Sequence, residues 1–546
     1  MSAAELAHAP VEHLALLARV WGFLKYHHAD VAAGKRNWDY ELFRVIPSVA
    51  KAKSRSQAEA AIVRWIDRAG MPPACRSCAQ TPRSPVLEPP IAWIHDTKLL
   101  GKDLSARLVR VHRDRPTESD QYYVAFEGAK NPDFSNEASY KENPYPDAGY
   151  RLLALYRFWN VIAYWFPYRD VMNEDWNEVL VEFIPRVIAA KDQDDYRLAM
   201  IDLVSRVHDT HANVWDAIDS RPPRGGCWIP APIRIVGDRF VVPPRPDSLK
   251  GVAASFRAGD VILAIDGMPV DSLVRAWAPH YGASNDAAQR RDIARWLVRG
   301  PCGACRVTLD RGRGPQEIAA ARDSARFLKT RPGAPTHDLP GPTFRKLADD
   351  VAYLKLSSVV ADSAASYVQR AEGTRCLVID IRNYPSQFMV FALGQHLVDR
   401  PTPFAKFTRG DAANPGAFVW TDSVIIQPAA PHYAGKVVIL VDEATQSSAE
   451  YTSMAFRSVP GSLVVGSTTA GADGNVSTVP LPGGINGRIS GIGVFYPDGR
   501  PTQRVGIVPD LVVHPTVEGI RAGRDEVLEA ALEAALGRVV RFSPGP

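Results

Sequence analysis

An internal repeat constrains the N-terminal part of the chain more than any other feature. Residues 11–70 and 149–208 align without a gap at a constant offset of 138 residues. Both copies carry apolar residues at spacings of three and four, which predicts helices. We therefore predict a duplicated helical unit. The matching pairs are Trp21 and Trp159, Tyr26 and Tyr164, Trp38 and Trp176, Leu42 and Leu180, Ile46-Pro47 and Ile184-Pro185, and Lys53 and Lys191.

The segment between the two copies differs in pattern. SARLVRVHR and QYYVAFE read as strands, and NPDFSNEASYKENPYPDAG reads as a loop. The predicted domains are a helical unit at 1–84, a β/loop segment at 85–148, and a second helical unit at 149–222. Only the second unit ends in Asp209-Thr210-His211. We therefore expect this end to carry a function that the first copy lacks.

Residues 223–325 form the next predicted domain. Short strands lead to FRAGDVILAIDGMPV at 256–270, which resembles the core of a PDZ domain. PDZ domains bind a peptide as an added strand and hold its carboxylate in a loop of backbone amides. That glycine-rich loop is not evident here.

Residues 326–546 have an α/β pattern. The apolar run 437–441 predicts a buried strand, and Ser447-Ser448-Ala449-Glu450 begins a predicted helix. A serine at such a junction lies beside free backbone N–H groups and the positive end of a helix dipole, as a nucleophile requires. A helix-capping serine without chemistry is the alternative, and Ser447 is the alternative nucleophile.

His211 is a candidate general base because a serine nucleophile needs one. Two alternatives stay open for this residue. It could cap or pack against a helix, or it could bind a metal together with His208, although no third ligand follows at a useful spacing.

In their order along the chain, these features resemble the carboxyl-terminal processing (tail-specific) serine peptidases. The resemblance rests on DTH, the PDZ core, VIDIRNYPS, DEATQSSAEY, VVGSTTAGADGN, YPDGRPTQRVGIVPD and the closing LEAAL helix, within residues 200–535. It implies an α+β multidomain chain with a ClpP/crotonase-like α/β catalytic core beside a PDZ-like domain. It also implies cleavage of unstructured polypeptides near their C-terminus, and it places the nucleophile on Ser448.

The residues around the base resemble the tricorn-like branch of this family. The common branch uses a lysine in a GKG motif, where this chain has Ala472 and Asp473. The tricorn-like branch uses a histidine preceded by a small hydroxyl residue, which Thr210 and His211 match. Gln503 lies near the place of that branch's supporting glutamate. Its amide could orient the imidazole but could not stabilise an imidazolium by charge.

The same resemblance implies an oxyanion hole built from backbone N–H groups. One is that of Ala449, and the other comes from Ser386 or Gln387, where two glycines usually stand in the family. Backbone donors survive a change of side chain if the turn is kept.

The composition limits the classes of binding partner that we expect. The net charge of +4 is spread without basic runs, which does not favour nucleic acid, and no apolar run is long enough to span a membrane. We expect a polypeptide substrate, no cofactor and no metal, with a homo-oligomer left open. The N-terminus lacks signal-peptide features, so we expect a cytoplasmic protein, or a periplasmic or extracellular one if a signal peptide has been removed.

Six cysteines include the pairs Cys75-x-x-Cys78 and Cys302-x-x-Cys305. The pairs are too far apart in sequence for a typical zinc ribbon, so local disulfides or plain thiols are the expected states. For the whole chain, a serine endopeptidase is the main hypothesis. A catalytically inactive PDZ-containing peptide-binding relative and a purely structural scaffold are the alternatives.

Overall fold

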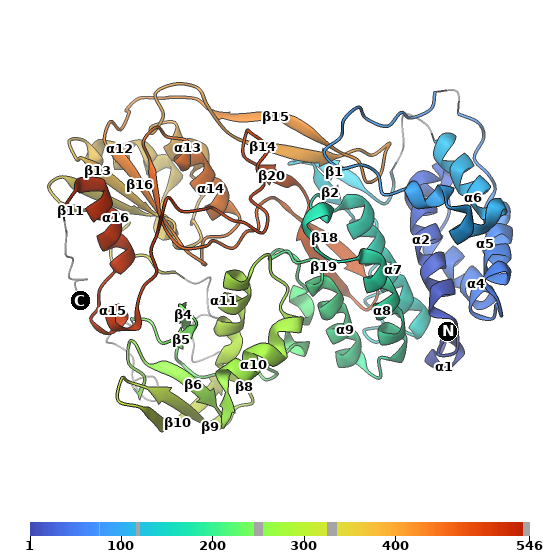
Figure 1. Cartoon of the computed structure of the whole chain (residues 1–546), viewed down its shortest axis with the longest axis horizontal. Helices are drawn as coiled ribbons and strands as arrows, with labels where there is room; N and C mark the ends of the chain where they lie inside the picture. The colour runs from blue at the N-terminus through green and yellow to red at the C-terminus, as the bar shows by residue number, and fades with distance from the viewer. Residues whose placement is uncertain (76, 116–120, 245–254, 325–335, 539–546) are drawn as a thin grey trace.

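The computed structural model describes residues 1–75, 77–115, 121–244, 255–324 and 336–538, and it is a mixed helix and sheet multidomain structure. A helical body containing the N-terminus lies at one end (Figure 1). A body built on a parallel sheet lies at the other end, and an antiparallel β unit lies beside the sheet body. The predicted boundary between residues 325 and 326 lies outside the described residues. Among the described residues, no helix has the length and hydropathy needed to cross a bilayer.

The helical body contains the two copies of the repeat in the same order. The first copy consists of α2 (Val11–His27), α4 (Trp38–Ala50) and α5 (Arg55–Ala69), and the second of α7 (Ala148–Trp165), α8 (Trp176–Ala189) and α9 (Gln193–Ser205). In each copy two indoles donate to each other's backbone carbonyl: Trp21 and Trp38 at 3.1 and 2.9 Å, Trp159 and Trp176 at 2.5 and 2.9 Å. The matched tryptophans are thus buried core residues with satisfied donors.

The two copies pack against each other through α2 and α7. Gly22 permits the close approach, because a Cβ at this position would lie 1.9 Å from the Asn160 side chain. The equivalent residues Tyr26 and Tyr164 meet edge to face, with ring centroids 5.6 Å apart. The two copies of the repeat therefore share one continuous core.

The segment 85–148 differs from its prediction in one element. SARLVRVHR lies within α6 (Thr97–Arg113), so the strand prediction for it was wrong. Leu100, Leu104, Leu108 and Val111 recur at helical spacing and are buried, and Asp96 caps the N-terminus. QYYVAFE does contribute a short strand, β1 (Ala125–Glu127), which pairs with β2 (Asn131–Asp133).

The β unit is an antiparallel sheet in the order β4-β5-β6-β9-β10-β3-β8, with β7 beside β6. Helix α11 (Asp286–Leu297) packs against β4, and α10 (Val270–Trp277) packs against β6. The strands are β3 (Cys227–Trp228), β4 (Arg234–Val236), β5 (Arg239–Val241), β6 (Val261–Ile265), β7 (Met268–Pro269), β8 (Arg299–Gly300), β9 (Gly303–Asp310) and β10 (Pro315–Ser324).

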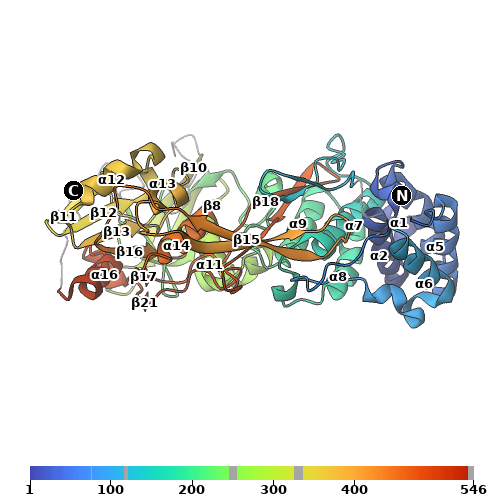
Figure 2. The same cartoon turned by 90° about the horizontal axis from the view of Figure 1, so that it is seen from above.

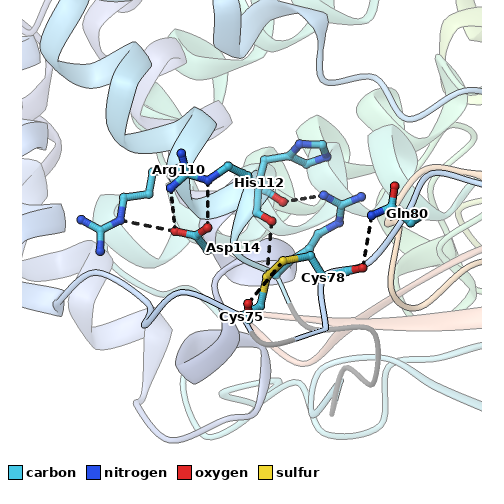
Figure 3. The surroundings of a disulfide bond; sticks show 8 residues. Cys75, Cys78, Gln80, Arg110, His112 and Asp114 are labelled. Atoms are coloured by element: carbon cyan, nitrogen blue, oxygen red, sulfur yellow. Dashed lines mark hydrogen bonds and ion pairs between the residues drawn. A yellow bond between two sulfur atoms is a disulfide. The ribbon is translucent and has the colours of Figure 1, made fainter.

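The cysteines form one of the two expected local disulfides. Cys75 and Cys78 are bonded near the end of α6, where Arg110 and Arg113 hold Asp114 (Figure 3). Cys302 pairs with Cys227, 75 residues away, rather than with Cys305. The antiparallel pairing of β3 with β8 brings these two cysteines together. Cys305 and Cys376 are buried thiols.

The sheet body has the strand order β11-β12-β13-β16-β17-β21, and all pairs are parallel except β11 with β12. Side chains on alternate faces form two cores. α12 (Ala364–Ala371), α13 (Val390–Gly394) and α14 (Ser448–Arg457) pack on one face, and α16 (Glu526–Leu536) packs on the other. The strands are β11 (Phe344–Ala348), β12 (Val351–Lys355), β13 (Cys376–Asp380), β16 (Lys436–Val441), β17 (Leu463–Gly466) and β21 (Leu511–Val512).

Two hairpins of the C-terminal half extend toward the helical body. The ribbon of β14 (Thr402–Gly410) and β15 (Phe418–Ile426), with β20 (Gly493–Phe495), spans the gap between the bodies (Figure 2). The hairpin of β18 (Val476–Leu481) and β19 (Ile485–Ser490) buries its apolar residues in the helical core. This packing brings the end of β19 to residues 209–213, because Arg488 pairs with Asn213. The short helices are α1 (Ala3–Leu6), α3 (Ala29–Ala32) and α15 (Val517–Arg521).

Candidate active site

The turn between β16 and α14 carries the two candidate nucleophiles. Ser448 is the first residue of α14, as the prediction of a strand-to-helix junction requires. Ser447 precedes it with φ 56° and ψ −120°, a conformation that residues with a side chain rarely adopt. Strained backbone of this kind clusters at active sites, and a sharp strand-to-helix turn exposes a serine hydroxyl.

Glu450 is a buried carboxylate that holds this turn in place. It accepts hydrogen bonds from the backbone N–H groups of Ser447 (3.3 Å), Gly471 (2.8 Å) and Ala472 (3.0 Å), and from the Thr469 hydroxyl (2.5 Å). Burial raises the pKa of Glu450 to about 7, while these hydrogen bonds act in the opposite direction. Ser447 N–H also donates to Ala472 O at 3.0 Å. Glu450 therefore joins the start of α14 to the loop 469–472.

The same loop binds the segment that carries the histidine. The Thr210 hydroxyl donates to Ala470 O at 3.2 Å, and Thr210 N–H donates to the Ser284 hydroxyl at 2.9 Å. Thr210 and Ser447 are thus bonded to loop residues only two positions apart, Ala470 and Ala472. Thr210 positions the segment and is not in contact with a reacting group.

His211 is buried beside the end of β19. Its Nδ1 lies 3.0 Å from the Ser490 hydroxyl, and its Nε2 makes no hydrogen bond within the described residues. Burial lowers the pKa of His211, and the negative charge of Asp209 opposes that shift. A neutral imidazole with Nδ1–H donated to Ser490 leaves Nε2 as the proton acceptor.

Asp209 is a member of the site that sequence reasoning missed. One carboxylate oxygen accepts from His211 N–H at 3.0 Å, and the other accepts from Ser490 N–H at 2.8 Å. This fully buried carboxylate therefore holds both the histidine and its Nδ1 partner. Its position directly before Thr210-His211 was the available signal, whereas nothing in the sequence indicated Ser490.

Gln503 forms no hydrogen bond with the imidazole in the described residues, and its direct orienting of His211 stays a prediction. Its amide donates instead to Asp209 Oδ1 at 3.3 Å and to the Ser284 hydroxyl at 3.4 Å. The side-chain oxygen of Gln503 is buried and has no partner within the described part of the chain. Its link to His211 is indirect, through the Asp209 carboxylate.

The predicted oxyanion donors are largely engaged. Ala449 N–H donates to Gln446 O at 3.0 Å, and Ser386 N–H donates to Leu356 O at 2.9 Å. In this arrangement neither group is free to bind an oxyanion, because tertiary and turn bonds already use them. Gln387 N–H and Ser448 N–H have no acceptor within the described residues.

Two arginines of the β unit bind the turn before the serines. Arg291 of α11 donates to Glu443 O at 2.8 Å and to the Gln446 side chain at 2.7 Å. Arg234 of β4 donates to Asp442 Oδ2 at 3.3 Å. The β unit therefore supports residues 442–446 directly.

One cluster in the described ranges has the residue types of a metal site. His337, Asp442 and Glu443 place ligand atoms within 4.8 Å of one another. Arg234 lies 3.3 Å from Asp442 and 3.9 Å from Glu443, so a protein cation already balances these carboxylates. His208 binds Glu174 at 3.0 Å rather than joining His211.

The contact between Gln503 and Asp209 yields a prediction about stability. In Gln503→Glu a second carboxylate would face buried Asp209, so we expect a lower free energy of unfolding by about 2–4 kcal/mol at pH 8. Burial beside Asp209 would raise the pKa of the new carboxyl, so the loss should grow as pH rises above about 4.3, the unfolded value. Urea unfolding of the variant and wild type at pH 5 and pH 8 measures this loss of stability. Gln503→Met is the uncharged control, and equal stability of the Glu variant and wild type at pH 8 would contradict the contact.

Solved structures of known proteins share the fold of this chain. The chain resembles mature CPAF complexed with lactacystin (17% identity, 71% of this chain and 98% of that chain, TM-score 0.55). It also resembles a point mutant of CPAF (16% identity, 71% and 96%, TM-score 0.57). Both likenesses concern the fold. The photosystem II D1 C-terminal processing protease matches at 18% identity over 68% of this chain and 96% of that chain, with a TM-score of 0.40.

No curated protein matches the chain by sequence. Residues 350–513 match the model of peptidase family S41, and this range includes both candidate serines and Gln503. Residues 350–513 are thus a peptidase family S41 region, and the protein is a serine peptidase.

Proposed function

We propose that this protein is an endopeptidase in which Ser447 is the nucleophile and His211 is the general base. The strained backbone of Ser447 at the turn between β16 and α14 is the observation that carries the proposal. Strain of this kind persists only where the surroundings enforce it, and here Glu450 and Ala472 bind the Ser447 N–H.

The backbone donors also favour Ser447 over the sequence-based candidate Ser448. In a strand-to-helix nucleophile turn, the N–H of the residue after the nucleophile binds the oxyanion. For Ser447 this donor is Ser448 N–H, which has no acceptor among the described residues. For Ser448 it is Ala449 N–H, which is bonded to Gln446 O. The choice of Ser448 stays a prediction that substitution can test.

In the proposed reaction His211 Nε2 takes the proton from the serine hydroxyl as the oxygen attacks the scissile carbonyl. The imidazolium then returns the proton to the leaving amine, and a water repeats the sequence on the acyl enzyme. Ser490 holds the Nδ1 side of the ring at 3.0 Å. Asp209 supplies negative charge close to the imidazolium, which is the role that Gln503 cannot fill.

The oxyanion that forms in each half of the reaction needs preorganised donors. We propose Ser448 N–H and Gln387 N–H for this role. Gln387 is anchored by its own side chain, whose oxygen accepts from Ala361 N–H at 2.6 Å. Ser386 then acts as an anchor of the same turn through its bonds to Leu356 and Val359.

We further propose that residues 223–325 form a PDZ-like domain and 326–546 a ClpP/crotonase-like core, with boundaries 1–84, 85–148 and 149–222 before them. The antiparallel sheet with α11 packed beside the edge strand β4 supports the PDZ-like assignment. Such a domain would bind an extended chain end, so the proposed substrate is an unstructured polypeptide cut near its C-terminus, without a cofactor.

Substitution of each serine tests the assignment. We expect Ser447→Ala to lower the turnover of unfolded casein on the order of 10⁴-fold or more, as removal of a nucleophile does. Ser448→Ala keeps its backbone N–H and should retain turnover within about tenfold of wild type. Each variant is the control for the other, with thermal unfolding to confirm the fold. Loss of turnover in Ser448→Ala but not in Ser447→Ala would make Ser448 the nucleophile. Activity in both variants would indicate that the protein does not use this turn for catalysis.

The pH dependence tests the base. His211 must be neutral to accept a proton, and burial lowers its pKa. We therefore expect kcat/KM to rise with pH through an apparent pKa below about 6.5, the ordinary imidazole value, and to stay high at pH 8. Asp209→Asn removes the charge that raises the pKa of His211, so the rise of kcat/KM with pH should move to lower pH. Activity confined to pH above about 9 would indicate a lysine base instead.

A further inference from the structure

A cavity in the helical body lies between the two copies of the repeat. Its volume is about 330 Å³, near the lower end of the range of about 300–1,000 Å³ for small-molecule sites. Helix α2 contributes Arg19, and the second copy contributes Trp159, Trp176 and Asn177. Trp93 forms a further wall. The peptidase site does not use any of these residues.

The repeat supplies an internal comparison for this cavity, because residues 138 apart hold equivalent positions. Arg19 of α2 corresponds to Arg157 of α7. Arg157 Nη2 lies 2.7 Å from Asp39 Oδ2, and its Nε lies 3.0 Å from Glu137 Oε2. Lys25 Nζ lies 2.6 Å from the other oxygen of Glu137. Two cations and two carboxylates therefore neutralise one another at the sister position.

The cavity lacks both the carboxylate and the lysine of its sister. Asp39 corresponds to Asn177, a neutral amide, and Lys25 corresponds to Ala163, whose methyl group lines the cavity. Arg19 forms no ion pair with a carboxylate in the described ranges, and its guanidinium lies 4.5 Å from the centre of the Trp93 ring. The change to alanine replaces a lysine by a methyl group, and the change to asparagine removes the carboxylate that pairs with the sister arginine. Asp96 and Asp175 still act on the charge of Arg19 from a distance.

A second guanidinium, that of Arg169, also lines the cavity. Its Nη2 donates to two backbone carbonyls, whereas its Nη1 is buried without a hydrogen-bond partner in the described residues. Burial lowers the pKa of Arg169 to about 10. The acid among the lining residues is Glu174, and its carboxylate is already held by Arg206 at 2.7 and 2.8 Å and by His208 at 3.0 Å. Two guanidinium groups therefore line the cavity, and the one lining carboxylate in the described residues is already paired; Asp96, Asp170 and Asp175 are nearby acids outside the lining.

We propose that this cavity binds a carboxylate attached to an aromatic or bulky apolar group, with Arg19 as the main charged contact. A planar guanidinium matches the two oxygens of a carboxylate, and the charge of Arg19 and Arg169 favours an anion. The indole walls suit an apolar body. A free aromatic acid and the terminal residue of a polypeptide share this chemistry.

Matched acid and amide probes test the proposal on the full-length protein. Hydrocinnamate should bind at concentrations on the order of 1 mM or below, and the neutral hydrocinnamamide at least about tenfold more weakly. Calorimetric titration measures both, and quenching of the wall tryptophans gives a second readout. A tetrapeptide ending in phenylalanine, as free acid and as amide, distinguishes the sources. Stronger binding of the peptide acid than of hydrocinnamate assigns the cavity to a chain end, and the reverse assigns it to a free acid.

Two variants and a control test whether hydrocinnamate binds in this cavity. Arg19→Gln should weaken hydrocinnamate at least about tenfold. Asn177→Asp supplies the carboxylate of the sister position, so it should cause a similar loss without a loss of thermal stability. Arg64→Gln, on an exposed face of α5, should bind as wild type does. Equal binding of acid and amide, no binding of the acid, or unchanged binding by both variants would overturn the proposal.

Discussion

The proposed catalytic centre depends on the hydrogen bonds of one buried carboxylate, that of Glu450. A buried carboxyl group is costly unless its oxygens are hydrogen-bonded, and here they accept three backbone N–H groups and one hydroxyl. These bonds hold Ser447 in its strained conformation and fix the loop 469–472. Because Ala470 of that loop accepts from Thr210, the histidine segment and the serine turn share one support. Chain segments more than 230 residues apart in the sequence thereby form one site.

Local features of this site could be read from the sequence. The strand at 437–441, the serines at the start of the next helix and the DTH motif depend on short-range pattern, and all lie where the sequence analysis placed them. The partners of these residues could not be read in the same way. Ala449 N–H is engaged because it donates to Gln446 O, whereas Ser448 N–H has no acceptor in the described residues. Ser490, the partner of His211, comes from the β18–β19 hairpin, which packs against the helical body.

The difference between short-range pattern and tertiary contacts also explains the predictions that were wrong outside the site. The run SARLVRVHR alternates apolar and charged residues, which suggests a strand, but its burial against the helical core follows a spacing of three and four. Cys302 lies three residues from Cys305 in sequence, yet the pairing of β3 with β8 places Cys227 beside it. Gln503 lies beside the candidate site, where its amide donates to Asp209, and its role stays a prediction.

The duplicated helical unit shows how one framework can hold two different interiors. Both copies keep the reciprocal indole bonds that define their core. The first copy pairs its cations with Asp39 and Glu137 beside a cavity of about 280 Å³, and the second has Asn177 and Ala163 in place of Asp39 and Lys25 beside a cavity of about 330 Å³. The two copies therefore differ in how the charges beside their cavities are paired, and the second is the proposed binding site.

The central claim is that the strained residue of the serine turn is the nucleophile. Labelling the native protein with a fluorophosphonate, followed by digestion and fragment mass analysis of the labelled peptide, tests it most directly. We expect one covalent adduct, located on Ser447, with labelling suppressed in His211→Ala. An adduct on Ser448, or labelling at the wild-type rate without His211, would contradict it.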